Sequence, residues 1–191
     1  LDPTLAEAHS NLGNLLLARG DNTAAEASFL RALALRRDYP FALFGLGEAR
    51  LALGRCEEAC VNFEQASAQD PAFHEALYNL SRARSALAAN LERASDAATP
   101  SPAVVANAEI ALESILAALQ LSRDNPVYWR QFEHCVKDFD LRHPVDSRVR
   151  DSLFRALGRP AVAPARLVRP IAGLVATRPD AVEFQRRLPV S

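Results

Sequence analysis

Histidine, cysteine and acidic side chains lie close together in one stretch of the chain. His134 and Asp138 are one helical turn apart, and Cys135 and His143 are near them in sequence. Adjacent His134 and Cys135 point to different faces of a helix, so they do not make a nucleophile–base pair. No Ser, His and acid combination stands out in the sequence, and Gly45-Leu46-Gly47 lacks the third glycine of a nucleotide-binding loop. We therefore predict no catalytic residues and no cofactor in this chain.

The three cysteines are too few for a disulfide framework. Cys56 and Cys60 lie one turn apart on a predicted helix, where a disulfide between them has poor geometry. A metal site needs two more ligands, and no residues can be assigned as those ligands. We interpret Cys56 and Cys60 as small buried side chains and predict no metal site. The cytoplasm is the expected compartment for such a chain.

The elements that position these residues repeat along the chain with a period of about 34 residues. Five small, aliphatic or aromatic positions recur in phase between residues 11–40 and residues 45–71. The pairs are Leu12 and Leu46, Gly13 and Gly47, Gly20 and Gly54, Ala25 and Ala59, and Phe29 and Phe63. A fixed period of this length indicates an array of helix hairpins, in which stacked neighbours supply the core that one hairpin lacks.

Each recurring residue has an expected structural role. Gly13 and Gly47 allow the second helix of the hairpin to approach closely. Gly20 ends the first helix with a residue that is free to take positive φ. Asp21 is a suitable cap for the helix that follows. Phe29 fills the space between one unit and the next.

This pattern resembles the tetratricopeptide repeat (TPR). The resemblance covers about residues 1–138 and implies an all-α, TPR-type α-solenoid, a right-handed superhelix of helix hairpins. We expect units at about 6–39, 40–73, 74–125 and 126–157, the third with an insertion and the fourth degenerate. Residues 139–191 are expected to form a helical extension that acts as a cap or as a connector to a further domain.

The expected helices follow the repeat and then depart from it. In the first two units they span about 5–19, 22–36, 40–53 and 56–69. The third unit has no glycine at position 88, so its first helix is expected to run to about Ala94. A loop around 95–102 follows, and Ser101 and Pro102 open the next helix, at about 102–121. A helix ending near Asp138, helices at 147–157 and 164–177, and a last short helix complete the prediction.

In TPR proteins the first helix of each unit lines a concave face, mainly at its second, fifth, sixth, ninth and twelfth positions. Here those positions carry amides, aromatics such as Phe41, and mixed charges. Amide side chains pair with a peptide backbone whatever its sequence, and aromatic rings hold apolar side chains. We predict that a protein or peptide binds this groove, although a merely solvated face remains the alternative. The candidate site residues are Ser10, Asn11, Asn14, Phe44, Glu48, Tyr78, Asn79, Arg82, Arg130 and His134.

The same resemblance argues against one kind of ligand. TPR clamps that grip the C-terminal carboxylates of chaperones use Lys at the fifth position and Asn at the ninth, then Asn, Lys and Arg on the following helices. Asn14 fits the ninth position, but Ser10, Gly45, Glu75 and Asn79 do not supply the rest. We therefore predict no carboxylate clamp.

Residues 126–173 carry a second resemblance. Val127–Phe132, Arg142–Asp146, Leu153–Leu157 and Leu167–Ile171 look like the region after the repeats in bacterial TPR proteins with an S-adenosylmethionine-dependent methyltransferase domain. This chain has no glycine-rich cofactor loop, so the resemblance implies the substrate-recognition arm of a larger enzyme. The first two units are also similar to the arrays of peptide O-glycosyltransferases. An enzyme arm is therefore the alternative function.

Charge is distributed unevenly along the chain, although the net charge is −1. Residues 141–191 hold ten Arg and four acidic residues, a balance of +6, whereas the remaining 12 basic and 19 acidic residues give −7. The basic part either binds an anionic partner or folds back on the acidic array, which we favour because its Arg residues are spaced among apolar ones. We predict no nucleic-acid partner.

The termini and composition give three further expectations. Leu1-Asp2-Pro3 looks like the end of a preceding repeat, in phase with Asp70-Pro71, so we expect a piece of a longer protein. Its first helix should then have an uncapped apolar flank that allows self-association. No apolar run of about 18 residues is apparent, so we predict no membrane span. A single Lys against many Arg and Ala suggests a GC-rich bacterial gene.

Overall fold

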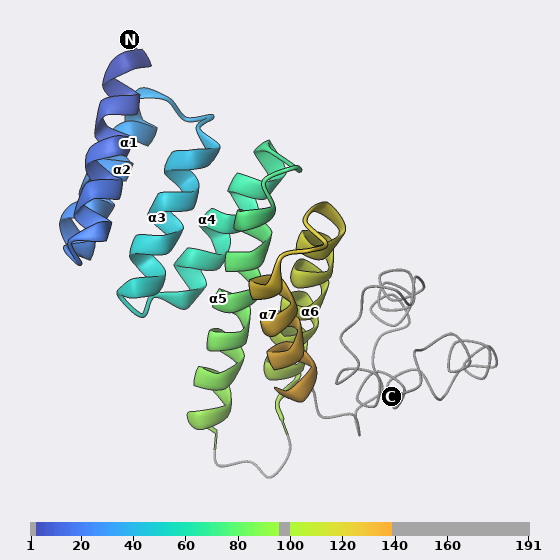
Figure 1. Cartoon of the computed structure of the whole chain (residues 1–191). Coiled ribbons are helices and arrows are strands. Elements are labelled where there is room, and N and C mark those ends of the chain that lie inside the picture. Colours follow the sequence, from blue (N-terminus) through green and yellow to red (C-terminus); the bar gives the residue numbers. More distant parts are fainter. Residues whose placement is uncertain (1–2, 96–99, 139–191) are drawn as a thin grey trace. The chain divides into compact units, whose positions relative to one another are not determined.

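The computed structural model describes residues 3–95 and 100–138. Within them the chain forms seven α-helices and no strand (Figure 1). The helices are α1 (Pro3–Ala18), α2 (Asn22–Leu35), α3 (Pro40–Ala52), α4 (Cys56–Gln69), α5 (His74–Arg93), α6 (Pro102–Leu121) and α7 (Pro126–Asp138). Each lies within two residues of the bounds that the sequence predicts. The expected helices beyond residue 138 and the extension 139–191 lie outside the described residues.

The chain divides into two compact units, Leu1–Leu87 and Ala88–Ser191. The first unit contains α1 to α4 and most of α5. The second contains the last residues of α5 together with α6 and α7. The predicted repeat boundaries remain a prediction.

Two glycines end the first helices of the hairpins, as expected. Gly20 has φ of 80° and Gly54 has φ of 78°, a conformation that side chains with a Cβ rarely adopt. Asp21 then caps α2, because its carboxylate accepts a hydrogen bond of 3.2 Å from the backbone N–H of Ala24. The chain therefore turns sharply between α1 and α2 without a long loop.

Phenyl rings fill the space between the helices of the first unit. A Cβ atom on Gly13 would lie 2.7 Å from the ring of Phe29, and one on Gly47 would lie 2.6 Å from the ring of Phe63. Gly45 of the following hairpin also lies against the Phe29 ring. The space at Gly13 and Gly47 is thus filled by an aromatic side chain of the second helix. The backbone of that helix does not fill it. This explains how one ring contacts two successive hairpins, as the repeat predicts.

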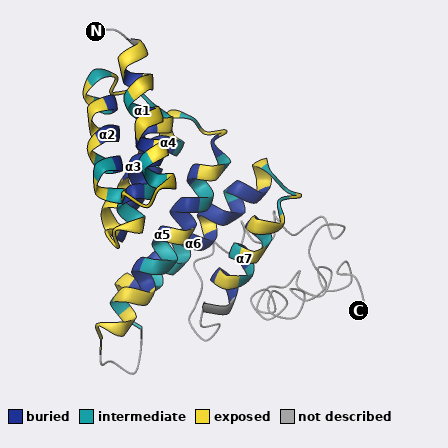
Figure 2. Cartoon of the chain, turned by 60° about the vertical axis from the view of Figure 1, so that its left-hand side comes forward, coloured by how far each residue is buried: buried dark blue, intermediate teal, exposed yellow. Residues whose placement is uncertain are grey.

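Small residues surround these rings in separate buried clusters. On α2 and α3 the buried set is Ala25, Phe29, Ala32, Ala42, Leu46 and Ala49. On α4 and α5 the corresponding buried set is Ala59, Cys60, Phe63, Leu80 and Ala83. Figure 2 shows this buried surface along the inner sides of the helices. Burial of these apolar side chains is the main source of stability.

The second unit contains α6, a helix of 20 residues, and the shorter α7 of 13 residues. Ser101 caps α6 by accepting a hydrogen bond of 3.3 Å from Val104 N–H, and Pro102 occupies the first turn. On α7 the indole Nε1 of Trp129 donates a 2.7 Å hydrogen bond to the carbonyl of Arg123. The ring of Trp129 also meets Phe132 edge-on at 5.8 Å. The hydrogen bond joins α7 to the turn that follows α6.

One stretch bears on the expectation that the chain has no membrane span. By length and composition α6 is a helix that could cross a membrane. Half of its most apolar window is buried within the protein, and buried core helices pass the same test. Its buried apolar residues are Val104, Ala111, Leu112, Ile115, Leu116, Ala118 and Leu119. Asn107, Glu109 and Glu113 interrupt this stretch, so it holds no continuous apolar run of about 18 residues.

Candidate functional site

Four of the predicted site residues lie together in the first unit. Glu48 comes from α3, and Tyr78, Asn79 and Arg82 come from one turn of α5. Arg82 Nη1 donates a 2.8 Å hydrogen bond to Asn79 Oδ1, and its guanidinium carbon lies 5.7 Å from the centre of the Tyr78 ring. The Asn79 side chain also donates a hydrogen bond to the Glu48 carboxylate. We call these four residues the α3–α5 polar cluster.

Burial controls the ionisation of the acid in this cluster. Desolvation raises the pKa of Glu48 above its ordinary value, and the charge of Arg82 and the hydrogen bond from Asn79 only partly offset this effect. Arg82 is exposed, while Glu48 and Tyr78 are half-buried. The cluster therefore presents a guanidinium that is held close to an aromatic ring. Burial makes the negative charge of the nearby Glu48 carboxylate energetically unfavourable.

The aromatic residues of α3 differ in their availability. Phe44, a predicted site residue, is half-buried, and its ring contacts Phe63 at 5.8 Å and Phe73 at 4.9 Å. Phe41 is 61% exposed, and its ring lies 5.2 Å from Phe73. Phe41 therefore offers an open apolar contact, whereas Phe44 mainly packs the core. The position of Phe41 in the repeat predicts that it faces the groove, but the sequence does not show how exposed its side chain is.

Two predicted site residues are buried, which corrects their expected roles. Ser10 is 3% exposed and Asn79 is 4% exposed. The Asn79 amide is engaged by Arg82 and Glu48, so it orients these side chains and does not pair directly with a peptide backbone. Asn11 and Asn14 are exposed on α1. These two amides are open to a ligand as expected, and the site as a whole remains a prediction.

Arg130 and His134 complete the predicted set. Both are exposed and lie one turn apart on α7, in the second unit.

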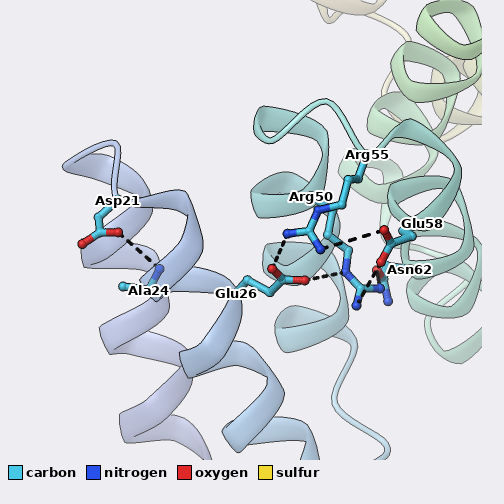
Figure 3. A network of polar contacts seen from close by, with 7 residues as sticks. All are labelled: Asp21, Ala24, Glu26, Arg50, Arg55, Glu58 and Asn62. Carbon is cyan, nitrogen blue, oxygen red and sulfur yellow. Dashed lines mark hydrogen bonds and ion pairs between the residues drawn. The ribbon is translucent and has the colours of Figure 1, made fainter.

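A second polar network joins α2, α3 and α4 (Figure 3). Arg50 on α3 donates 3.0 Å hydrogen bonds to Glu26 on α2 and to the buried Asn62 on α4. Arg55 also binds Glu26, and Glu58 lies 3.4 Å from Arg50. Arg84, at the equivalent position of the next unit, makes a similar ion pair with Glu64 of α4. An arginine of the first helix thus joins each unit to the second helix of the unit before it.

The pKa of the Glu26 carboxylate is shifted in the opposite direction from the pKa of Glu48. Its side chain is only 13% exposed, and this burial by itself would raise the pKa. The hydrogen bonds and positive charges of Arg55 and Arg50 together outweigh burial, so the pKa of Glu26 lies below its ordinary value. This network stabilises the contacts among α2, α3 and α4.

The cysteines are buried free thiols. Burial raises the pKa of Cys60 to about 11, so its thiol is a poor nucleophile. Among residues 3–95 and 100–138 no group of three or more His, Cys, Asp or Glu side chains could hold a metal ion. Cys56 and Cys60 are small buried side chains, as interpreted from the sequence.

Several solved structures share this arrangement of helices. A thermophilic TPR protein of Thermus thermophilus superposes with a TM-score of 0.61 at 22% identity, over 94% of this chain and 87% of its own. The first TPR of Spaghetti (RPAP3), bound to an HSP90 peptide, superposes with a TM-score of 0.60 at 16% identity, over 72% of this chain and 94% of its own. The chain has a tetratricopeptide-repeat fold.

Another likeness is to a larger enzyme. The TPR fold of this chain also matches an O-GlcNAc transferase of Thermobaculum terrenum with a TM-score of 0.55 at 22% identity. That match covers 83% of this chain but only 26% of the transferase. No family model and no curated protein matches the sequence. The comparisons thus give the all-α TPR fold and do not identify the residues of the site.

Proposed function

We propose that this TPR chain binds an extended protein or peptide segment on the face formed by the first helices of its hairpins. The α3–α5 polar cluster carries the proposal. Asn79 holds Arg82 over the Tyr78 ring, so the guanidinium is oriented before a ligand arrives. Preorganised charged and aromatic groups of this kind reduce the entropy lost on binding. A peptide-bound neighbour with the same fold supports this class of function.

The spacing of side chains along α3 indicates how far apart the contacting groups of the ligand lie. Phe41 and Glu48 are seven residues apart on α3, or about 10 Å along the helix axis at 1.5 Å per residue. An extended peptide covers that distance with about three residues at 3.3 Å each. We propose that an apolar ligand side chain contacts Phe41. At the Glu48 end of this span, a carboxylate or carbonyl oxygen of the ligand then accepts hydrogen bonds from Arg82 of the same cluster.

The proposed ligand is not a chaperone C-terminus held by a carboxylate clamp. The HSP90 peptide bound by the neighbour is acidic, but Ser10 is buried here and Gly45 has no side chain to offer. We expect an acidic C-terminal peptide of this type to bind weakly, with no further loss in Asn14→Ala. Tight, salt-sensitive binding in a fluorescence polarisation titration would show that a clamp exists.

A random peptide library displayed on phage tests the main proposal. Peptides selected on the chain should bind Arg82→Ala and Phe41→Ala about tenfold or more weakly, which corresponds to about 1.4 kcal/mol for each loss. Arg31→Ala is the matched control, since Arg31 is an exposed arginine on α2. Failure to select any peptide, or selected peptides that bind all the variants equally, would overturn the proposal.

A second proposal is that the chain is the recognition arm of a larger bacterial modification enzyme. The likeness to one quarter of an O-GlcNAc transferase supports it. The methyltransferase resemblance depends on residues 126–173, most of which lie outside the described residues. Sequencing the parent gene tests this proposal: a catalytic domain encoded with these repeats would support it, and a gene encoding the repeats alone would exclude it.

We also propose a cytoplasmic location in a bacterium. Three free, buried cysteines fit a reducing compartment. The bacterial origin is proposed from composition, since the chain has one Lys among its 22 basic residues.

A further inference from the structure

The two charged residues of the α3–α5 polar cluster are joined through a neutral amide. The side-chain nitrogen of Asn79 donates a hydrogen bond to the Glu48 carboxylate, and its Oδ1 accepts a 2.8 Å hydrogen bond from Arg82 Nη1. Because Asn79 is buried, its amide is a fixed part of the protein and is not exchanged for solvent. A hydrogen-bond donor and an acceptor are therefore held at opposite ends of one amide group.

Both charged groups keep hydrogen-bonding capacity after they bind Asn79. An ionised carboxylate has about four acceptor sites, and a guanidinium has several N–H donors, of which Asn79 takes one each. Arg82 is exposed and Glu48 is half-buried, so solvent reaches both side chains. A ligand can therefore bind Arg82 and Glu48 at the same time without displacing Asn79.

The orientation of the Asn79 amide indicates which ligand group suits this pair. Its oxygen faces Arg82 and its nitrogen faces Glu48. A second amide in the same orientation would accept a hydrogen bond from Arg82 on its carbonyl oxygen and donate its N–H to Glu48. An amide of the ligand has the same dimensions as the amide of Asn79, so it matches the donor–acceptor separation that Asn79 already bridges.

A carboxylate of the ligand suits the pair less well. It has no N–H to donate to Glu48, and its negative charge would lie near a carboxylate that is already partly desolvated. Desolvation raises the pKa of Glu48 above its ordinary value, which shows that a negative charge is unfavourable at this position. A second negative charge beside it would add repulsion to that cost, although it would also be attracted by Arg82.

We propose that Glu48 makes this site selective for an uncharged amide of the ligand, whose carbonyl binds Arg82 and whose N–H binds Glu48. This inference rests on the proposed function, in which Arg82 could bind either a carboxylate or a carbonyl oxygen. Glu48 determines the choice between the two in favour of the carbonyl. The amide belongs to an Asn or Gln side chain or to the peptide backbone, since both present the same two groups.

Peptides that are selected on the wild-type chain by phage display and then synthesised are the probes. In one arm each Asn or Gln of a peptide is replaced by Asp or Glu. In the other arm each backbone amide in turn is replaced by an ester, which removes its N–H. We expect one replacement to weaken binding about tenfold in a fluorescence polarisation titration, as for the loss of a hydrogen bond to a charged group. The arm in which this loss occurs identifies the source of the amide.

The variant Glu48→Gln shows whether Glu48 causes the selectivity. The same replacement should cost this variant much less, because glutamine carries no negative charge. Glu57→Gln is the matched control, since Glu57 is an exposed glutamate on α4 outside the cluster, and it should show the full loss.

Two kinds of failure can be told apart. Selected peptides that need Arg82 but tolerate every replacement, or that lose equal affinity for the wild type and Glu48→Gln, would overturn this inference alone. A failure to select peptides, or selected peptides that do not need Arg82, would overturn the proposed function and this inference with it.

Discussion

Gly45 of the second hairpin lies directly against the ring of Phe29 from the first. A Cβ atom on Gly45 would overlap that ring, which also borders Gly13 of its own hairpin. The contact makes two successive hairpins share one buried side chain. The absence of a side chain at Gly45 is therefore as important for packing as the presence of one at Phe29.

Gly45→Ala should destabilise the protein by about 1–3 kcal/mol, the usual cost of overpacking a core. This loss occurs even though alanine is the better helix former by about 1 kcal/mol. Thermal or urea unfolding measures the change. In the background of Phe29→Leu the same substitution should cost much less, because the smaller side chain leaves room for the methyl group. Equal costs in both backgrounds would contradict this account of the contact.

Glu26→Gln should lower the free energy of unfolding at pH 7 by about 1–2 kcal/mol, because charged hydrogen bonds to Arg50 and Arg55 are lost. We expect the lower part of this range, since Arg55 is partly exposed. Because the folded-state pKa of Glu26 is lowered, its contribution is complete above the ordinary value of 4.5 and is lost as pH falls through the folded value. Urea unfolding at several pH values should show the two proteins converging in acid.

Glu58→Gln is the control for that experiment. Glu58 belongs to the same network, but its side chain is 46% exposed. Exposed ion pairs contribute about 0–1 kcal/mol, so this change should have little effect. A loss as large as that of Glu26→Gln would mean that burial does not determine the strength of the network.

Glu48→Gln should stabilise the chain at pH 7. It should also weaken the binding of any ligand that depends on the α3–α5 polar cluster. The folded-state pKa of Glu48 is raised, so the unfolded chain loses this proton first as pH rises above 4.5. Stability then falls with rising pH until the folded protein is also ionised, and glutamine removes this penalty. The gain in melting temperature should vanish at low pH. Glu113→Gln, at an exposed site on α6, is the control and should change the melting temperature little at pH 7.

The cysteines should be unreactive in the folded protein. All three are buried, and a thiol with a pKa of about 11, such as Cys60, is only about one part in a thousand thiolate at pH 8. A chromogenic disulfide reagent should therefore label them slowly until guanidinium unfolds the chain and releases three thiols. Rapid labelling of Cys60 in the native state would contradict the buried packing role.

Most of the local structure follows from the sequence alone. The repeat period predicts the helices of the first two hairpins within two residues, and Gly20, Gly54 and Asp21 mark the turn signals. Helix ends and the repeat spacing depend on residues that are close in sequence, so they can be predicted without knowledge of the fold. The repeat also predicts which positions face a groove, and Glu48, Tyr78 and Arg82 were predicted from it.

The tertiary structure alone determined how those side chains are used. Asn79 was expected to bind a ligand, but packing buries it and turns its amide toward Arg82 and Glu48. The Glu26–Arg50 pair joins residues 24 positions apart, and no local pattern signals it. The sequence by itself determined the repeat and the helix ends. Burial, partner choice and ionisation depend on how neighbouring hairpins pack in space, and the order of residues along one helix does not fix that packing.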